Sequence, residues 1–422
     1  MGFDLENLPD DWQVKSIREV TVRTSYRDPG KQPDKIFRYV DVSSVDNVLC
    51  KIRNVTELKG SEAPSRARKD IRSNDVLFAT VRPTLKRVAL IPHELDGEIA
   101  STGYCVLRAN EEKVEPTFLY DCLITDWFID AIGKLERGAS YPAVRDSDVF
   151  NTKIPLPPLV EQRKIAGVLG VVQRAIEQQE QLLQRTTELK KTLLHHLFTH
   201  GLRGEPQKKT EIGLVPESWE VVSLEKLVEN TPQVNMRSEA QREIQYIDVS
   251  SISREFLRIE STNGYRLEDA PGRARKKVKT GDVIFATVRP TLLRVARVTE
   301  KYDEQVCSTA FCVLRDRNKN TNGRFIYYLI QRERFVKQLA AIESGASYPA
   351  VTDRQVKAQL VPLPREQEQL EIAAILEASD VKIRMHASKK RAIEDLFRTL
   401  LHHLMTAQIR VNDLNLLDIK TI

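Results

Sequence analysis

The hydrophobic positions of this chain follow two different spacings. Short runs rich in β-branched and aromatic residues predict strands. Four of these runs are FRYVDV, DVLFATV, RVALI and GYCVLR, which start at Phe37, Asp75, Arg87 and Gly103. From Thr117 to Lys134, hydrophobic residues instead recur every three or four positions, which predicts helix. The first part of the chain therefore has a mixed α/β pattern.

The whole pattern recurs 207 residues later. DVLFATVRPTL starts at Asp75 and DVIFATVRPTL starts at Asp282, and the same offset separates the two GASYPAV loops, at Gly138 and Gly345. This period is too long for one unit of a solenoid. It predicts a duplicated pair of domains.

A proline-rich segment follows each mixed part, with IPLPPL from Ile154 and VPLPRE from Val361. Proline fixes φ and lacks a donor, so we expect a hinge there. Hydrophobic residues at alternating three- and four-residue spacing then predict a coiled-coil helix of about 40 residues. The two seams comprise Ile165, Leu169, Val172, Ile176, Leu183, Leu193 and Leu197, and then Ile372, Leu376, Ile383, Ile393, Phe397, Leu400 and Leu404. The polar residues that interrupt them, which can fix the register, are Gln179, Thr186, Lys190, Ser379, His386 and Lys390.

These patterns predict an α+β chain in which two long antiparallel coiled-coil helices separate two mixed α/β domains. The duplication predicts a pseudo-twofold relation, because repeated domains in one chain can imitate a symmetric dimer. The expected boundaries are a first domain at 1–157, a first helix at 158–203, a second domain at 204–364, a second helix at 365–410 and a C-terminal tail at 411–422.

Composition restricts the function only weakly. The chain has 422 residues, of which 65 are Lys or Arg and 59 are Asp or Glu, and a net charge of +6 is mild for this length. Five cysteines without a C-x-x-C motif argue against a disulfide framework and favour reduced cytoplasmic thiols. Cys105 and Cys312 are expected to be small core residues. No hydrophobic run approaches the roughly 20 residues of a membrane span.

Motifs of nucleotide binding and of common hydrolases are missing from the sequence, including G-x-x-x-x-G-K-[ST], G-x-G-x-x-G, H-E-x-x-H and G-x-S-x-G. The adjacent histidines of the two LLHHL segments would form poor chelates, because neighbouring residues diverge on a helix. Pro33-Asp34 with Glu57-Leu58-Lys59 imitates a metal-dependent nuclease, but the second repeat has other residues there, namely Ala240, Gln241, Gly264 and Arg266. We therefore predict no catalytic and no metal-binding residues.

Each repeat contains a basic, strand-rich segment, at 64–87 and 271–294. Such segments can neutralise phosphates, although a solvated strand face is the alternative. Tyr141 and Tyr348 of the GASYPAV loops could stack on nucleic acid or could pack a structural turn. Trp12 and Trp219 are expected at the edge of each core. The candidate DNA-binding residues are Arg66, Arg68, Arg82, Lys86, Arg87, Tyr141, Arg273, Arg275, Arg289, Arg294 and Tyr348.

Together these features resemble the DNA-specificity subunit of a type I restriction-modification system. The resemblance covers nearly the whole chain and rests on LPDDW and VPESW, DVLFATVRPTLKRVAL, GASYPAV, IPLPPLVEQRKIAGVL and LLHHLFT. The second PLPREQEQ departs from the first PLPPLVEQ but keeps Glu368 and Gln369 opposite Glu161 and Gln162.

The resemblance implies that each mixed domain is a target-recognition domain for half of a split site on double-stranded DNA. The helices would be spacers that dock two methyltransferase subunits, and restriction subunits that translocate DNA would join them. The partners would use S-adenosylmethionine, ATP and Mg²⁺, whereas this subunit would hold no cofactor and catalyse nothing. It would lie in the prokaryotic cytoplasm, associated with the nucleoid and not with a membrane.

The near-identity of the basic segments predicts a nearly palindromic site. Two regions differ strongly between the repeats and could make the halves unequal, namely 23–38 against 230–245 and 46–63 against 253–270. Three alternatives remain at this stage. The chain could serve a related type II system with a fused methyltransferase-nuclease, or be a coiled-coil scaffold without a DNA role, or be a nuclease itself.

Overall fold

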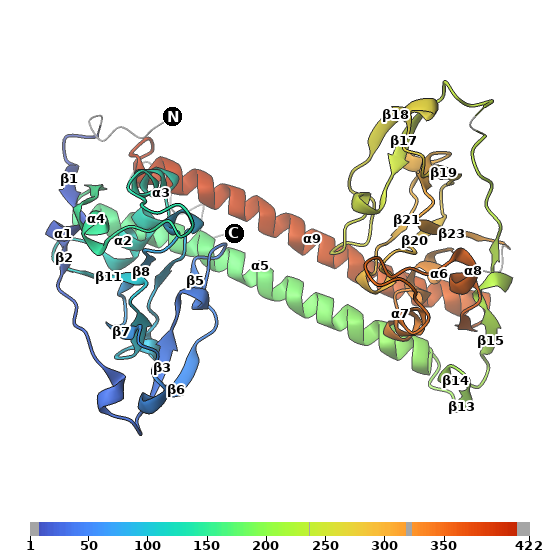
Figure 1. Cartoon of the computed structure of the whole chain (residues 1–422), viewed down its shortest axis with the longest axis horizontal. Helices are drawn as coiled ribbons and strands as arrows, with labels where there is room; N and C mark the ends of the chain where they lie inside the picture. Colours follow the sequence, from blue (N-terminus) through green and yellow to red (C-terminus); the bar gives the residue numbers. More distant parts are fainter. Residues whose placement is uncertain (1–7, 236, 318–322, 412–422) are drawn as a thin grey trace. The chain divides into compact units, whose positions relative to one another are not determined.

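The structure is a computed structural model that describes residues 8–235, 237–317 and 323–411. The chain divides into two compact units (Figure 1). Unit 1 comprises residues 1–178 and 390–422, and unit 2 comprises residues 179–389. The predicted C-terminal tail lies outside the described residues, apart from Val411.

Unit 1 contains two four-stranded sheets. In spatial order, the first is β6 (Thr56–Lys59), β3 (Ile36–Val40), β10 (Ile99–Ser101) and β7 (Ala67–Asp70), and the second is β2 (Thr21–Val22), β11 (Tyr104–Ala109), β8 (Val76–Ala79) and β9 (Val88–Leu90). Only the pairing of β3 with β10 is parallel among the described pairs of these sheets. The four runs predicted as strands are β3, β8, β9 and β11, so this part of the prediction is confirmed. Two short pairs complete the strands, β1 (Gln13–Ser16) with β12 (Lys153–Leu156) and β4 (Val45–Asp46) with β5 (Lys51–Ile52).

The helical stretch predicted from Thr117 to Lys134 is two helices, α2 (Pro116–Leu123) and α3 (Asp126–Gly133). The chain turns between them because the Thr125 hydroxyl accepts a hydrogen bond from the Phe128 N–H at 3.4 Å and so caps α3. Hydrophobic spacing alone does not reveal this interruption. The other short helices of the unit are α1 (Ile17–Val20) and α4 (Asp146–Asn151).

Unit 2 repeats this plan (Figure 1). Its sheets are β18 (Asn263–Arg266), β17 (Glu243–Ile247), β22 (Val306–Ser308) and β19 (Ala274–Lys277), and then β16 (Val228–Glu229), β23 (Phe311–Asp316), β20 (Val283–Ala286) and β21 (Val295–Arg297). Its short helices are α6 (Gly323–Leu329), α7 (Glu333–Ala340) and α8 (Asp353–Lys357). Two strand pairs remain, β13 (Gln207–Thr210) with β14 (Gly213–Pro216) and β15 (Glu220–Ser223) with β24 (Leu360–Leu363). The duplication in sequence is therefore a duplication of fold.

The segments predicted as hinges begin as strands. Pro155 of β12 lies opposite Val14, and Pro362 of β24 lies opposite Val221, each in a two-stranded antiparallel pair. A two-stranded pair tolerates proline because each strand has a free edge where its missing donor is not needed. The chain enters the long helix only after this strand ends.

The two long helices are α5 (Leu159–His200) and α9 (Glu366–Met405). In unit 1, the first turns of α5 share a hydrophobic core with the last turns of α9, including Leu169 and Leu404. In unit 2, the end of α5 shares a core with the beginning of α9, including Leu197 and Ile372. The helices therefore pack antiparallel, as predicted. Gly201, with φ of +65°, follows the last residue of α5 and takes the left-handed conformation that commonly ends a helix.

The polar seam positions of unit 2 form direct contacts. His386 Nδ1 lies 3.0 Å from Gln179 Oε1, and these residues occupy the same position of the two repeats. Lys190 Nζ lies 2.7 Å from Asp380 Oδ1, and both side chains are largely buried. The Tyr328 hydroxyl donates to the other carboxylate oxygen of Asp380 at 2.7 Å. A shift of one helix turn would separate these partners, so the contacts specify the register.

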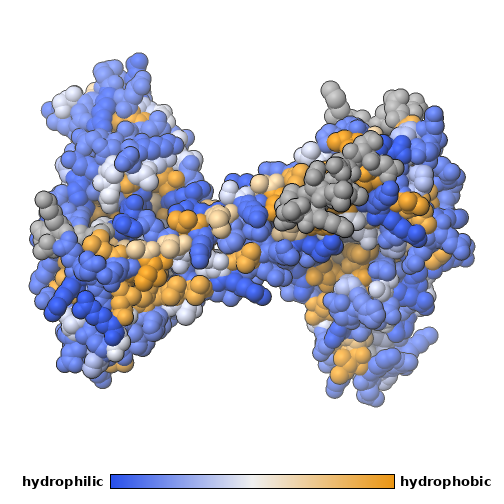
Figure 2. Space-filling model, turned by 180° about the vertical axis from the view of Figure 1, so that it is seen from behind, coloured by the Kyte–Doolittle hydropathy of each residue, from blue (hydrophilic) through white to orange (hydrophobic). Residues whose placement is uncertain are grey.

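Each domain core is attached to the first turns of a long helix by a buried tryptophan. The Trp12 indole donates to Glu161 at 3.2 Å, and the Trp219 indole donates to Glu368 at 3.1 Å. Cys105 and Cys312 are also buried, as predicted, and burial raises the pKa of both thiols. Most of the surface in Figure 2 is hydrophilic. Within the described ranges, no helix is long and apolar enough to cross a membrane.

Candidate nucleic-acid interface

The turn between β8 and β9 holds an arginine in a strained backbone conformation. This turn contains the short 3-10 helix η4 (Pro83–Leu85), and Arg82 just before it has φ of +49° and ψ of +54°. Arg289 precedes the equivalent η9 (Pro290–Leu292) with φ of +50° and ψ of +59°. The left-handed region is costly for residues other than glycine. Lys86 and Leu293, at the other end of the same turn, are also left-handed, so the two units share the shape of the whole turn.

The GASYPAV loop supports this arginine through the main chain. The Arg82 N–H donates to the Pro142 carbonyl at 2.7 Å, and the Arg289 N–H donates to the Pro349 carbonyl at the same distance. Gly138 gives the loop its shape because its φ is +95°. A Cβ atom there would lie 3.3 Å from the Tyr141 carbonyl oxygen.

Each arginine lies over the tyrosine of the loop. The Arg82 guanidinium carbon is 5.1 Å from the ring centroid of Tyr141, and Arg289 has the same distance to Tyr348. The two rings are 72% and 71% exposed. The sequence places these residues in separate motifs, and the structure brings them together. An exposed guanidinium beside an exposed ring can bind a phosphate and contact a base at one place.

A second basic position adjoins this pair. Arg66 is exposed, and its carbonyl accepts a hydrogen bond from the Thr102 N–H at 2.8 Å. The next residue, Gly103, accepts from the Thr80 N–H at 2.9 Å, and the Thr80 carbonyl accepts from the Val144 N–H at 2.9 Å. These bonds connect the Arg66 turn to the loop that carries Tyr141.

We call this surface the recognition face. It comprises Arg66, Arg82, Thr102 and Tyr141 in unit 1 and Arg273, Arg289, Thr309 and Tyr348 in unit 2. The equivalent bonds in unit 2 run from the Thr309 N–H to Arg273, from the Thr287 N–H to Ala310 and from the Val351 N–H to Thr287.

Other candidate residues lie differently. The Arg87 guanidinium donates to the carbonyls of Val42 and Val45, and Arg294 makes the equivalent pair of bonds in unit 2. Lys86 pairs with the exposed carboxylate of Asp126. These contacts hold the side chains to their own unit, and a role in DNA binding stays a prediction for each.

Arg68 lies on β7 of unit 1, and Arg275 lies on the equivalent strand β19 of unit 2. Arg68 bridges to Asp28 at 3.4 Å and donates to the Ala67 carbonyl at 2.8 Å. Arg275 donates to the Ala274 carbonyl at 3.0 Å. Both are partly exposed and lie two residues after Arg66 and Arg273 in the sequence.

Sequence reasoning missed the internal role of a lysine in the basic segment. The Lys69 side chain is only 5% exposed and pairs with Asp146 at 2.5 Å, which joins β7 to the start of α4. Burial alone would lower the pKa of Lys69, but the hydrogen bond to Asp146 and further contacts outweigh it, and the pKa is raised. Lys276 and Asp353 form the equivalent pair in unit 2. A lone acid 77 residues away gives no signal in the sequence.

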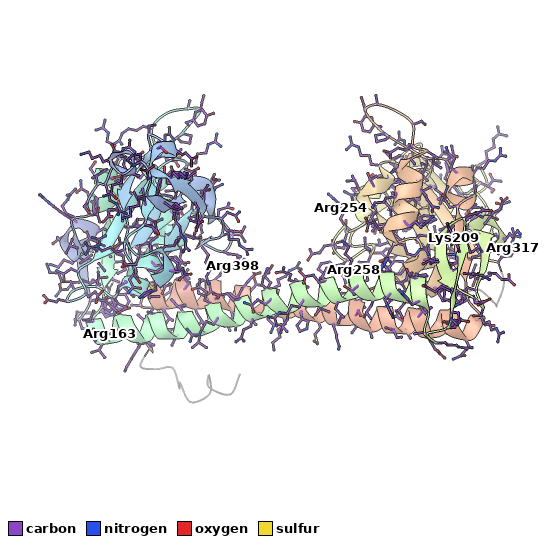
Figure 3. The ribbon with its side chains drawn as sticks, turned by 90° about the horizontal axis from the view of Figure 1, so that it is seen from below. Arg163, Lys209, Arg254, Arg258, Arg317 and Arg398 are labelled. Atoms are coloured by element: carbon purple, nitrogen blue, oxygen red, sulfur yellow. The ribbon has the colours of Figure 1, made fainter. Side chains whose placement is uncertain are left out.

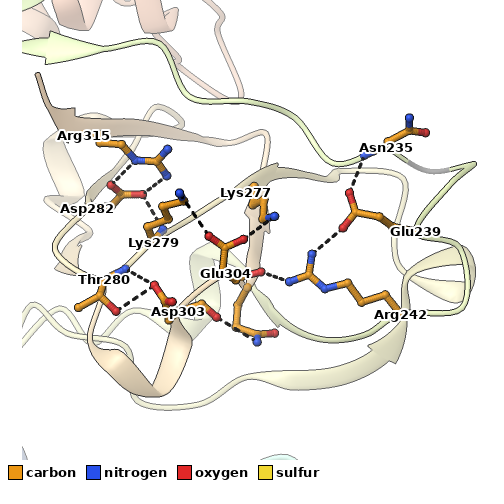
Figure 4. A network of polar contacts seen from close by, with 11 residues as sticks. Asn235, Glu239, Arg242, Lys277, Lys279, Thr280, Asp282, Asp303, Glu304 and Arg315 are labelled. Atoms are coloured by element: carbon orange, nitrogen blue, oxygen red, sulfur yellow. Dashed lines mark hydrogen bonds and ion pairs between the residues drawn. The ribbon is translucent and has the colours of Figure 1, made fainter.

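The acids of the basic segments are also neutralised internally. Asp75 receives two hydrogen bonds from the Arg108 guanidinium, at 2.8 and 2.7 Å, and is almost fully buried. Asp282 binds Arg315 in the same way, and Figure 4 shows it within a polar network of unit 2. The hydrogen bonds that the two arginines donate to these aspartates raise the pKa of both arginines.

Basic side chains also occur away from the recognition face. Figure 3 labels Arg163 and Arg398 on the long helices and Arg254 and Arg258 on the segment after η7 (Val249–Ser251). Arg163 and Arg398 face the acids Glu115 and Asp395 at 3.8 and 3.5 Å. Positive charge therefore does not identify an interface by itself, and the Arg–Tyr pair is distinguished from these residues by its recurrence in both repeats.

Comparison with known proteins finds relatives that match nearly the whole chain. The chain is 24% identical to the type I restriction enzyme MjaVIII specificity subunit of Methanocaldococcus jannaschii, over 97% of this chain and 95% of that protein. A solved structure concerned with complex assembly and conformational transition of the type I R-M system matches 94% of this chain and 98% of its own, with 29% identity and a TM-score of 0.57. The type I restriction-modification S subunit from M. genitalium matches 95% of this chain and 98% of its own, with a TM-score of 0.58. At 14% identity this last likeness shows the fold alone.

The family model described as the type I restriction modification DNA specificity domain matches twice, at residues 9–187 and 216–395. Each match begins just before the tryptophan of one repeat and ends within a long helix. Together the matches cover most of the chain, which therefore belongs to the family of type I restriction-modification DNA specificity subunits.

Proposed function

We propose that this chain is a non-catalytic subunit that recognises a bipartite DNA site and positions methyltransferase and restriction subunits on it. The observation that carries the proposal is the Arg–Tyr pair, which occurs once in each unit with the same 5.1 Å separation. A protein that binds two half-sites needs one recognition surface for each.

The chemistry of the pair suits DNA. The guanidinium presents five donors in a planar fork, which can bind a phosphate or the O6 and N7 atoms of guanine. The tyrosine offers a π face and a hydroxyl for a base or a phosphate. A main-chain hydrogen bond fixes the backbone of each arginine to the loop that carries the tyrosine, and both rings are exposed to a ligand.

The likeness of the two recognition faces supports a nearly palindromic site. Between 65–90 and 272–297, 17 of 26 positions are identical. Similar surfaces select similar base pairs, and the divergent regions 23–38 and 46–63 would make the halves unequal.

The long helices would dock the methyltransferase subunits. Several apolar side chains on them are exposed, and a partner could cover them. They include Val171 and Leu189 on α5 and Val381, Met385 and Leu396 on α9. S-adenosylmethionine, ATP and Mg²⁺ would be bound by the partners, and the assembly would act in the cytoplasm on the nucleoid.

A methylome tests the proposal. The chain is expressed with its methyltransferase in a host without DNA methylation, and N6-methyladenine is mapped by sequencing. We expect methylation at a split motif with similar inverted halves. A split motif with unrelated halves would retain the recognition function and reject the near-palindrome. No methylation from assembled, active partners would reject the function.

A further inference from the structure

We infer that one pair of equivalent positions, Tyr26 in unit 1 and Gln233 in unit 2, determines a base-pair difference between the two half-sites. This inference rests on the proposed function and names the side chains that act within it. Both residues lie in regions that differ strongly between the repeats.

The two side chains occupy the same place in their units. Tyr26 forms a backbone bridge with Lys69, and Gln233 forms the same bridge with Lys276. The following residues also agree, because the N–H groups of residues 27 and 234 donate to the carbonyls of residues 68 and 275, each at 2.9 Å. The position is therefore set by the main chain, whichever side chain it carries.

This place is connected to the recognition face through an ion pair, main-chain hydrogen bonds and short stretches of chain. Lys69 pairs with Asp146, which lies two residues after Val144, and the Val144 N–H binds Thr80 of the recognition-face network. Arg66 of the face and Lys69 are on the same short stretch of chain leading through β7. The Lys276–Asp353 pair gives unit 2 the same connection.

Tyr26 is available to a ligand. Its side chain is 65% exposed, although the Lys69 Nζ lies 4.9 Å from its ring centroid and restricts one side. Gln233 is also exposed. An exposed ring orientated by a buried lysine is arranged as a stacking platform.

The two units share their recognition-face residues but differ at other positions beside Tyr26 and Gln233, including Arg27 and Val234. The four residues of the recognition face are identical in the two units, and so are the supporting lysine and aspartate. Residues 145 and 352 also differ, but the Thr352 hydroxyl accepts from the Gln355 N–H at 3.2 Å and caps α8. That contact gives Thr352 a structural role, whereas nothing of this kind is found for Gln233 among the described contacts.

The two side chains suit different bases. A glutamine amide donates and accepts at once, which matches N7 and N6 of adenine in the major groove. Tyrosine cannot form that bidentate pair, and its ring stacks on a base or contacts the methyl group of thymine. The half-site bound by unit 2 is therefore expected to prefer adenine where the half-site bound by unit 1 does not.

The test exchanges the two residues in the full chain with its methyltransferase present. Methylomes are recorded for the wild type, Tyr26→Gln and Gln233→Tyr. We expect Tyr26→Gln to change the preferred base at one position of one half-site by about tenfold, towards the base preferred in the other half. Gln233→Tyr should make the opposite change in the other half.

The control is Val22→Glu, which also installs the residue of the second repeat, Glu229, at an exposed position. Val22 lies on β2, in the other sheet, and should leave the motif unchanged. An unchanged motif in both exchange variants, with a split motif from the wild type, overturns this inference and leaves the proposed function intact. Loss of all methylation in folded Tyr26→Gln would also overturn it, because the residue would then supply affinity and not selectivity. No split motif from the wild type rejects the proposed function itself.

Discussion

Removing the two stacked arginines is the most direct test of the recognition face. Arg82→Ala and Arg289→Ala delete exposed side chains, but the main-chain bonds to Pro142 and Pro349 remain possible. In the free protein each deletion removes an exposed cation–π contact, which contributes about 0.5–1 kcal/mol. The fold should therefore survive in both single variants and in the double variant.

The loss of DNA binding depends on what each guanidinium contacts. An arginine on a phosphate contributes about 0.9 to the slope of log affinity against log salt, so the double variant would lower the slope by about 1.8. An arginine bidentate to guanine would instead cost about 1–3 kcal/mol for the cognate site and much less for other sequences. The two cases differ in both salt dependence and specificity.

Fluorescence anisotropy over a salt series separates these cases, using the assembly with its methyltransferase on motif DNA and on scrambled DNA. Lys153→Ala is the matched control, because Lys153 is an exposed cation on β12, away from the recognition face. Affinity and slope equal to those of the wild type in the double variant would refute the assignment of the recognition face.

Three further predictions concern the supporting structure. Asp75→Ala leaves the Arg108 guanidinium without its buried partner, so urea denaturation should show a loss of about 3 kcal/mol, and an unchanged midpoint would contradict this. Gly345→Ala places a Cβ 2.9 Å from the carbonyl oxygen three residues on, at a φ of +106°, so it should weaken DNA binding and cost about 1–3 kcal/mol of stability in the same denaturation assay. Glu304 has its pKa held below the usual range by a hydrogen bond from Lys277, so its stabilising contribution is present above about pH 4.5 and lost as the pH falls through the lowered pKa. The protection of β19 amides from hydrogen exchange, after correction for the intrinsic pH dependence of exchange, should fall on acidification, and Glu304→Gln should reduce that response.

Much of the fold follows from patterns that do not depend on distant contacts. The strands and helices could be predicted because the spacing of hydrophobic residues is visible within a short window of the sequence. The antiparallel pairing of the helices could be predicted because the repeat is visible when the sequence is compared with itself. The interruption at Thr125 was missed because a cap is a single hydroxyl within an otherwise helical spacing. The predicted hinges were also incomplete, since Pro155 and Pro362 lie in strands whose partners are more than a hundred residues away.

Arg82 and Tyr141 were candidates from the sequence, and their role in DNA binding stays a prediction, but the contact between them could not be predicted. The basic segment and the GASYPAV loop were both identified, yet nothing local links Arg82 to Tyr141, 59 positions later in the chain. Counting charge also misleads, because Lys69 is buried against Asp146 and Arg87 binds carbonyls of its own unit. Net charge does not show which cations are already paired, and only tertiary contacts do.

Two kinds of contact in each unit, main-chain hydrogen bonds and a buried ion pair, explain how the repeats could keep one backbone structure and differ in DNA specificity. The bonds that place residues 26 and 233, and those that attach the tyrosine loop to the strained arginine, are main-chain hydrogen bonds. Such bonds form whatever side chain a residue carries, so substitution at an exposed position beside them costs little stability. The buried lysine–aspartate pair, in contrast, cannot lose one partner cheaply, and it is the same in both units. Exposed side chains that can be substituted with little loss of stability therefore lie next to a buried ion pair that cannot. A recognition domain needs this arrangement if its DNA target is to change while its fold does not.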